Sequence, residues 1–348
     1  MLRFEIFKTK QNIHSMIFVT GGTGLLGSHL LFQLTKEHTP IKAIFREKKK
    51  IELVRRLFLY YDEVNGQSRF ETIKWVNCDV LDIVTLNEEM SGYEYVYHCA
   101  AIVSFHKNDF FKMMKINREG TANIVNTCLD LGIKKLGYVS STAAIGNGEN
   151  DPIVTEGTKW KQSPTTSGYS IAKYSAEKEV WRGVEEGLDV IIVNPCVIVG
   201  AGDWKESSLT MFKTVENGLQ FYTSGANAFV DARDVATVLI ELMKSEIKNE
   251  RFLCIGENST FKNLFDNIAR KLNKKEAFIL VKPWLMGLTW RAMWLISKLT
   301  GKKSPITKET ARSAFGTTVY DTSKLKKTLN HSFYSIEEMV DNAVKGRL

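Results

Sequence analysis

The sequence has few of the residues that build covalent or metal-bound frameworks. Its 348 residues include only five cysteines, and none of them forms a C-x-x-C pair. Cysteines that are far apart and lie inside apolar runs are typical of reduced core residues in the cytosol. His98 and His106 lack the partner spacing of metal ligands, so we expect no metal site. The five cysteines are Cys78, Cys99, Cys128, Cys196 and Cys254.

Long hydrophobic runs and nucleic-acid motifs are also lacking. No apolar run reaches the ~18 residues of a membrane span. Residues 1–15 contain no apolar core of the kind found in signal peptides, and we expect a disordered leader without function. The net charge of +8 comes from basic residues spread along the chain. Because the sequence also lacks zinc-finger and RNP-like motifs, this charge indicates a solvated surface and no nucleic-acid partner. The predicted location is cytoplasmic.

The first 200 residues alternate short apolar runs with amphipathic stretches. This alternation predicts βαβ units, and therefore a Rossmann-type, doubly wound parallel sheet in the α/β class. The predicted helices include 51–61, 112–131 and 170–186. The predicted strands are 16–20, 41–45, 72–77, 95–98, 135–140 and 190–194.

After Gly200 the rhythm changes, because polar residues become denser and helical patterns dominate. We expect residues 16–200 to form an NAD(P)-binding Rossmann domain. Residues 201–348 are expected to form a smaller, mostly helical substrate-binding lobe, with some segments returning to the Rossmann sheet. In this lobe, 277–281 is a predicted strand and 283–298 a predicted helix.

A glycine-rich turn follows the first predicted strand. Gly21, Gly24 and Gly27 are spaced three apart in TGGTGLLG and open the first helix. One glycine allows the tight turn, one lets the backbone approach a pyrophosphate, and one lets helix and strand pack closely. In this context the motif predicts a dinucleotide site on a helix N-terminus, with Thr23 and Leu25–Leu26 around it.

The end of the second strand predicts which dinucleotide binds. An acid there would bind the ribose hydroxyl of NAD, whereas an arginine accommodates the 2′-phosphate of NADP. This chain has Arg46 at that position, with Lys50 close behind. NADP(H) is favoured and NAD(H) is the alternative, because Arg46 beside Glu47 also fits a solvated basic turn.

Tyr169 and Lys173 lie four residues apart on a predicted helix, so their side chains share a face. A nearby ammonium lowers the pKa of a phenol toward the range that acid–base catalysis uses. Ser141 ends the strand in YVSSTAAIG, where a hydroxyl could donate a hydrogen bond to a substrate oxygen. Taken alone, the Tyr169–Lys173 spacing also fits an exposed helix, and the Ser141 segment also fits a polar turn.

Together, TGGTGLLG, YVSSTAAIG and YSIAK resemble the extended short-chain dehydrogenase/reductase family, also called the NAD-dependent epimerase/dehydratase family. Within it the likeness is greatest to the dihydroflavonol reductase-like and 3β-hydroxysteroid dehydrogenase-like branch. The resemblance implies catalytic Ser141, Tyr169, Lys173 and Asn117. It also implies that Tyr169 and Lys173 contact the cofactor, together with Arg46 and Asp79, Val80, Ala100, Ala101, Pro195 and Val197.

The resemblance implies an NADP-dependent oxidoreductase that moves hydride between nicotinamide and a small carbonyl or alcohol substrate. Ala143 and Ala144 stand where the family's sugar-nucleotide dehydratases carry an Asp-Glu pair, which disfavours dehydration. Two alternatives stay open. One is a nucleotide-sugar epimerase that holds NAD tightly, and the other is a non-catalytic NADP-sensing protein.

The predicted helix 283–298 has an unusually large apolar and aromatic surface with basic flanks. Such a helix either covers a substrate pocket, which we favour, or lies in a membrane interface. The second interpretation would make the protein peripherally membrane-associated. A homodimer is also compatible with the sequence.

Overall fold

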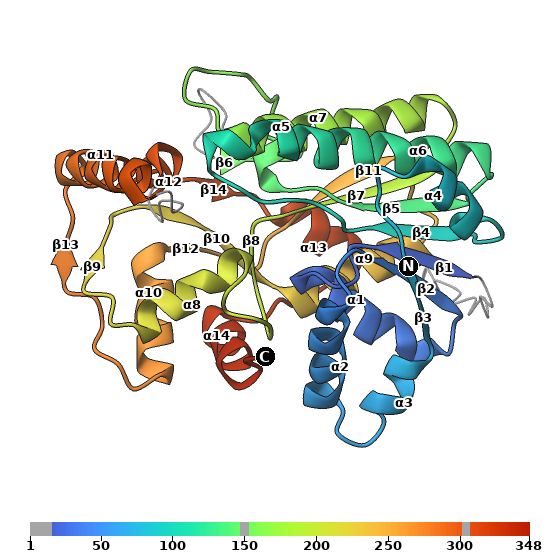
Figure 1. Cartoon of the computed structure of the whole chain (residues 1–348), viewed down its shortest axis with the longest axis horizontal. Helices are drawn as coiled ribbons and strands as arrows, with labels where there is room; N and C mark the ends of the chain where they lie inside the picture. The colour runs from blue at the N-terminus through green and yellow to red at the C-terminus, as the bar shows by residue number, and fades with distance from the viewer. Residues whose placement is uncertain (1–15, 147–152, 301–306) are drawn as a thin grey trace, which may run out of the picture.

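The computed structural model describes residues 16–146, 153–300 and 307–348. The predicted leader therefore lies outside the described residues. A seven-stranded sheet with every neighbouring pair parallel forms the centre of the molecule (Figure 1). Its order is β11-β7-β5-β4-β1-β2-β3. The strands are β1 (Ile17–Thr20), β2 (Ile41–Phe45), β3 (Ile73–Asn77), β4 (Tyr95–His98), β5 (Lys135–Val139), β7 (Val190–Pro195) and β11 (Glu250–Cys254).

Helices cover both faces of this sheet, because its central strands are apolar on both sides. One core joins the sheet to α1 (Leu25–Leu34), α2 (Lys49–Tyr61), α3 (Gly66–Glu71), α9 (Ala232–Lys244) and α13 (Ser323–Leu329). A second core lies on the opposite face, under α4 (Ile83–Met90), α6 (Gly120–Asp130) and α7 (Gly168–Glu185). The predicted fold class, a Rossmann-type doubly wound sheet, is confirmed.

A smaller sheet carries a third core. Phe212, Phe229, Leu264 and Met339 are fully buried there. The strands β8 (Val197–Val199), β10 (Ala226–Asp231) and β12 (Glu257–Thr260) pack with α8 (Thr210–Glu216), α10 (Phe261–Lys271) and α14 (Ile336–Lys345). The remaining elements are α5 (Phe110–Met113), β6 (Ile153–Val154), β9 (Phe221–Tyr222), β13 (Ile279–Leu280), α11 (Pro283–Thr300), α12 (Lys308–Ser313) and β14 (Val319–Tyr320).

The chain crosses between the two sheets more than once. After β10 it returns through α9 to β11, which pairs in parallel with β7 at the edge of the large sheet. The sequence analysis did not single out β10, β11 and β12 as strands. Their side chains are mixed in polarity, since β12 reads ENST and alternates between half-buried and exposed positions. Pairing partners far along the chain stabilise them, and local composition does not reveal such partners.

Candidate active site

Tyr169 lies at the start of α7, close to the end of β5. Ser167 caps this helix, because its hydroxyl accepts a hydrogen bond from the Ser170 N–H at 3.0 Å. Ser141 follows β5 and caps a short 3₁₀ turn by accepting from the Ala143 N–H at 3.2 Å. The Ser141 hydroxyl lies close enough to Tyr169 to favour the ionised form of the phenol. The fold therefore brings together two groups that are 28 positions apart in the sequence.

A short bridge holds the Ser141 turn against α7. The Ser170 hydroxyl donates to the Ala143 carbonyl at 2.7 Å, and the Trp160 indole N–H donates to Ser170 at 3.0 Å. The Trp160 ring also stacks on Tyr174 with a centroid separation of 4.1 Å. The two hydroxyl-bearing segments are consequently fixed to each other by direct bonds.

Lys173 is buried one turn after Tyr169 and points to the end of the sheet. Its Nζ donates to the Val139 carbonyl at 3.0 Å and to the Tyr138 hydroxyl at 3.2 Å. Burial lowers the pKa of Lys173 to about 8, although the nearby Glu177 carboxylate opposes this shift. The ammonium can therefore lose its proton within the ordinary working range of an enzyme.

One expectation about Tyr169 needs correction. We predicted that the Lys173 ammonium lowers the pKa of the phenol, but in this structure burial raises that pKa, and the nearby Ser141 hydroxyl opposes the rise. The reason is geometric, because Lys173 donates to Tyr138 and Val139 instead of Tyr169. Tyr169 and Lys173 lie four residues apart on α7, as predicted.

Glu177 is a buried carboxylate that the sequence analysis missed. It lies one turn beyond Lys173 and accepts from the Ser140 hydroxyl at 2.5 Å and from the Asn194 amide at 2.7 Å. Arg251 adds an ion pair at 3.0 Å. The Asn194 amide also donates to the Ser141 carbonyl at 3.0 Å. Glu177 thus joins the ends of β5 and β7, and β11 beside them, to α7, the helix that carries Tyr169 and Lys173. The sequence signal that could have revealed it is the spacing of four residues between Lys173 and Glu177, which places both on one face of the helix.

Asn117 lies in a π-helical turn, Met114–Glu119, that interrupts the predicted continuous helix 112–131. Its side chain is buried, and it accepts from the Ile102 N–H at 2.7 Å and donates to the Ile102 carbonyl at 2.9 Å. Such turns are frequent at functional sites. The observed role of Asn117 is to hold the segment after β4 in place.

The glycine turn is packed too closely for side chains at two of its glycines. Gly21 has φ +70°, and a Cβ there would lie 2.5 Å from the Ala100 nitrogen. A Cβ on Gly27 would lie 2.1 Å from the Gly21 carbonyl oxygen. At Gly24, the N-cap of α1, no side chain caps the helix. The first-turn N–H groups of a helix lack partners within it, so this end fits an anionic group.

The other predicted cofactor residues lie along the same edge of the sheet. Arg46 is exposed directly after β2, and Lys50 is in the first turn of α2, where it pairs with Glu206 at 2.6 Å. This pairing engages Lys50 with the loop after β8. The carboxyl ends of neighbouring parallel strands meet at one edge. Thr23, Leu25 and Leu26 follow β1, Asp79 and Val80 follow β3, Ala100 and Ala101 follow β4, and Pro195 and Val197 lie at the junction of β7 and β8.

His98 fastens β4 to its neighbours through both ring nitrogens. Nδ1 lies 2.6 Å from the Thr20 hydroxyl and Nε2 lies 2.9 Å from the Thr121 hydroxyl. Burial, reinforced by the positive charge of Lys173, lowers the pKa of His98 to about 3. The neutral ring is therefore a structural support beside the cofactor segment.

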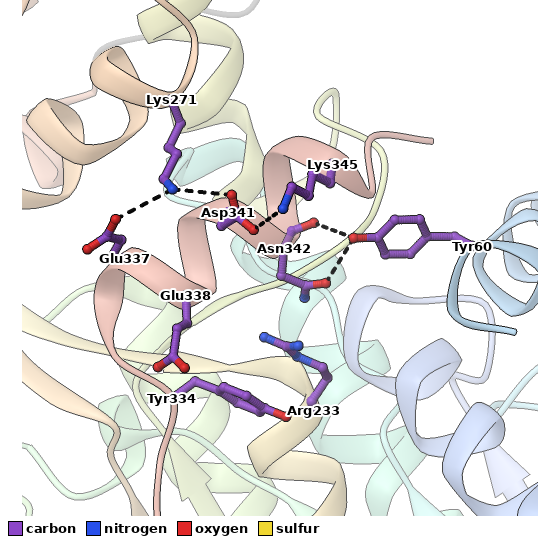
Figure 2. Close-up of a pocket in the computed structure, with 9 residues that line it drawn as sticks. All are labelled: Tyr60, Arg233, Lys271, Tyr334, Glu337, Glu338, Asp341, Asn342 and Lys345. Atoms are coloured by element: carbon purple, nitrogen blue, oxygen red, sulfur yellow. Dashed lines mark hydrogen bonds and ion pairs between the residues drawn. The ribbon is translucent and has the colours of Figure 1, made fainter.

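A surface pocket of about 550 Å³ lies between α2, α9, α10 and α14 (Figure 2). Its charges pair within it, because Asp341 contacts Lys271 at 3.3 Å and Lys345 at 2.7 Å. Arg233 stacks over the Tyr334 ring and pairs with Asp231. None of its nine lining residues belongs to the predicted site.

Comparisons with solved structures and curated proteins place this geometry among known folds. The UDP-glucose 4-epimerase of Thermotoga maritima, solved with UDP-glucose, superimposes with a TM-score of 0.73 at 19% identity, covering 95% of this chain and 98% of that one. This likeness concerns the fold alone.

Three curated relatives are more informative at the sequence level. The sterol demethylase protein B of Methylococcus capsulatus is 27% identical over 77% of this chain and 78% of its own. A putative dihydroflavonol 4-reductase of Synechocystis is 24% identical over 94% and 93%. A 3β-hydroxysteroid dehydrogenase/Δ5→4-isomerase of vaccinia virus is 29% identical over 68% and 70%. These relatives include both kinds of enzyme named in the resemblance, a dihydroflavonol reductase and a 3β-hydroxysteroid dehydrogenase.

The family model for the NAD dependent epimerase/dehydratase family matches residues 17–256. That span includes the glycine turn, Ser141 and the Tyr169–Lys173 pair. The predicted resemblance is confirmed: the chain belongs to the NAD dependent epimerase/dehydratase family, whose members are NAD(P)-dependent enzymes acting on alcohol and carbonyl groups.

Proposed function

We propose that the protein is an NADP(H)-dependent reductase or dehydrogenase acting on a carbonyl or alcohol substrate. The observation that carries the proposal is the placement of Ser141, after β5, beside Tyr169, at the start of α7, with the two segments joined by the bond from the Ser170 hydroxyl to the Ala143 carbonyl. We further propose that residues 16–200 hold the cofactor and that residues 201–348 supply most of the substrate contacts.

A bound nicotinamide dinucleotide would supply or accept the hydride. The uncapped end of α1 would hold its pyrophosphate, and the residues along the sheet edge would hold the rest of it. The protein's own groups handle the oxygen and the proton. In the reductive direction Tyr169 Oη donates its proton to the carbonyl oxygen, which the Ser141 hydroxyl orients by a hydrogen bond. Lys173, one helical turn after Tyr169, carries a positive charge below its pKa of about 8 and would then favour the phenolate that forms.

Arg46 supports NADP(H) over NAD(H). It is exposed after β2, at the position where an NAD-binding chain carries an acid. A guanidinium can bind a phosphate through two parallel hydrogen bonds. NAD(H) remains the alternative cofactor.

Replacing the phenol tests the proposed mechanism. Tyr169→Phe removes the proton donor, so we expect kcat to fall by about 10²- to 10⁴-fold while NADPH still binds. Tyr174→Phe, on the same helix, is the control and should retain turnover. The assay measures consumption of NADPH or NADH with aldehydes, ketones, steroids and dihydroflavonols as test substrates. Full activity of Tyr169→Phe would rule out the mechanism.

A nucleotide-sugar epimerase is the second candidate, since the family includes such enzymes. It would hold NAD through purification and return the hydride to its substrate. Absorbance and mass spectrometry of the purified protein distinguish the two. Stoichiometric NAD, with epimerisation of a sugar nucleotide, would favour the epimerase. Binding of NADPH without turnover of any substrate would favour a sensing role.

A further inference from the structure

The helix α11 presents an apolar surface to solvent along its whole length. We had favoured a role for it as the cover of a substrate pocket, but none of its residues is buried. Met286, Trp290 and Met293 are half-buried on the side toward the body of the protein. Four other large side chains, at helical spacing on the outer side, are 53–79% exposed: Trp284, Leu288, Leu295 and Leu299.

The surroundings of α11 extend this surface. Phe278 and Leu280, next to and within β13, are 68% and 51% exposed. Phe221 in β9 is also exposed, and β9 and β13 lie at the same end of the molecule as α11 (Figure 1). A broad apolar face on a helix is normally covered by another part of the protein or by a partner. The patch is therefore a candidate contact surface.

The charges of this segment are of one sign. Within α11 the only ionisable groups are Arg291 and Lys298, and the sequence contains no Asp or Glu from Ala277 to Lys308. Arg291 and Lys298 lie beside the Trp284–Leu299 stripe, on the outer side of the helix. Cations at the margin of an apolar helix face complement anionic phospholipid headgroups.

We propose that α11 and β13 dock the protein on an anionic membrane surface. The helix would lie along the interface, because no helix among residues 16–146, 153–300 and 307–348 is long and apolar enough to cross a bilayer. The leucines would enter the acyl boundary, and Trp284 and Trp294 would lie at headgroup depth. Pairing of two copies is disfavoured, since it would bring like charges together with no carboxylate from this segment.

The proposed docking surface is connected to the start of the catalytic helix. Glu309 of α12, which contacts α11, accepts a hydrogen bond from the Gly168 N–H at 3.5 Å. Arg312 donates to the Thr165 carbonyl at 3.3 Å. Docking through α11 would thus hold the start of α7, where Tyr169 lies, close to the bilayer. If the proposed function holds, the substrate class is an apolar carbonyl or alcohol that dissolves in lipid.

Vesicle co-sedimentation of the full-length protein tests docking independently of turnover. The vesicles contain phosphatidylcholine alone or with phosphatidylglycerol. We expect binding to the anionic vesicles and weaker binding at high salt. Leu288→Glu/Leu295→Glu should lower the vesicle affinity more than about tenfold, because two apolar side chains no longer enter the lipid. Arg291→Gln/Lys298→Gln should weaken binding only to the anionic vesicles.

The control is Val84→Glu, at a 70% exposed position on α4. It should bind vesicles as the parent does. Because all substituted side chains are exposed, unfolding temperatures and NADPH binding should match among the variants. Absence of binding to both vesicles would overturn the proposal. The proposal would also be overturned if light scattering showed that the parent is a dimer and the Leu288→Glu/Leu295→Glu variant a monomer, while the parent bound neither kind of vesicle.

Discussion

At the scale of single residues, spacing predicted which side chains share an element but not which atoms they contact. Tyr169 and Lys173 lie on one helix face as expected, yet Lys173 Nζ donates to Val139 and Tyr138. The direction of a long side chain depends on which acceptors the sheet presents. Here both acceptors belong to β5, and only its packing against α7 defines them.

Arg46 is the residue on which the proposed preference for NADP(H) depends. Arg46→Ala should raise the KM for NADPH by about ten- to a hundredfold, because the hydrogen bonds to a charged phosphate are lost. The KM for NADH should change little. The measurement is steady-state kinetics with each cofactor. Lys48→Ala, an exposed change in the same turn, is the control, and an equal loss with both cofactors would contradict the assignment.

At the scale of elements, α7 is joined to three strand ends through Glu177. Ser140, Asn194 and Arg251 all donate to this one carboxylate. The sequence placed strands and helices well where apolar runs were continuous, as in β2 and β4. It missed β10 to β12, and it could not show Glu177 as a junction, because the partners lie 17 to 74 residues away.

Replacing Glu177 should destabilise the fold. Glu177→Gln leaves the Arg251 guanidinium without its ion pair in a largely buried setting, so we expect the free energy of unfolding to fall by about 3 kcal/mol. Denaturant unfolding measures this change. Glu185→Gln, exposed on the same helix, should alter stability by less than about 0.5 kcal/mol. Similar values for both variants would show that the junction contributes little.

At the scale of the whole molecule, stability should depend on the neutral state of His98. Its pKa is lowered to about 3 in the fold, whereas an unfolded histidine titrates near 6.5. Between these values the unfolded chain binds the extra proton, so stability is lost as the pH falls from about 6.5 toward 3. The slope contributed is at most about 1.4 kcal/mol per pH unit.

The pH dependence is checked by denaturant unfolding from pH 7 downward in the parent and in His98→Gln. The variant should lose stability less steeply with acid, since it has no ring to protonate. His38→Asn, at an exposed position, should keep the parent's slope. Parallel curves for the parent and His98→Gln would exclude His98 as a source of the acid sensitivity.

The sequence by itself determined the parallel sheet, the glycine turn and the candidate residues Ser141, Tyr169 and Lys173. These follow from local signals: continuous apolar strands, a glycine repeat and one helical turn of spacing. Tertiary structure alone decided that Ser141 lies beside Tyr169, that Glu177 joins the strand ends, and that the outer face of α11 is uncovered. Each of these depends on segments distant in the chain, whose meeting is set by packing of the whole fold.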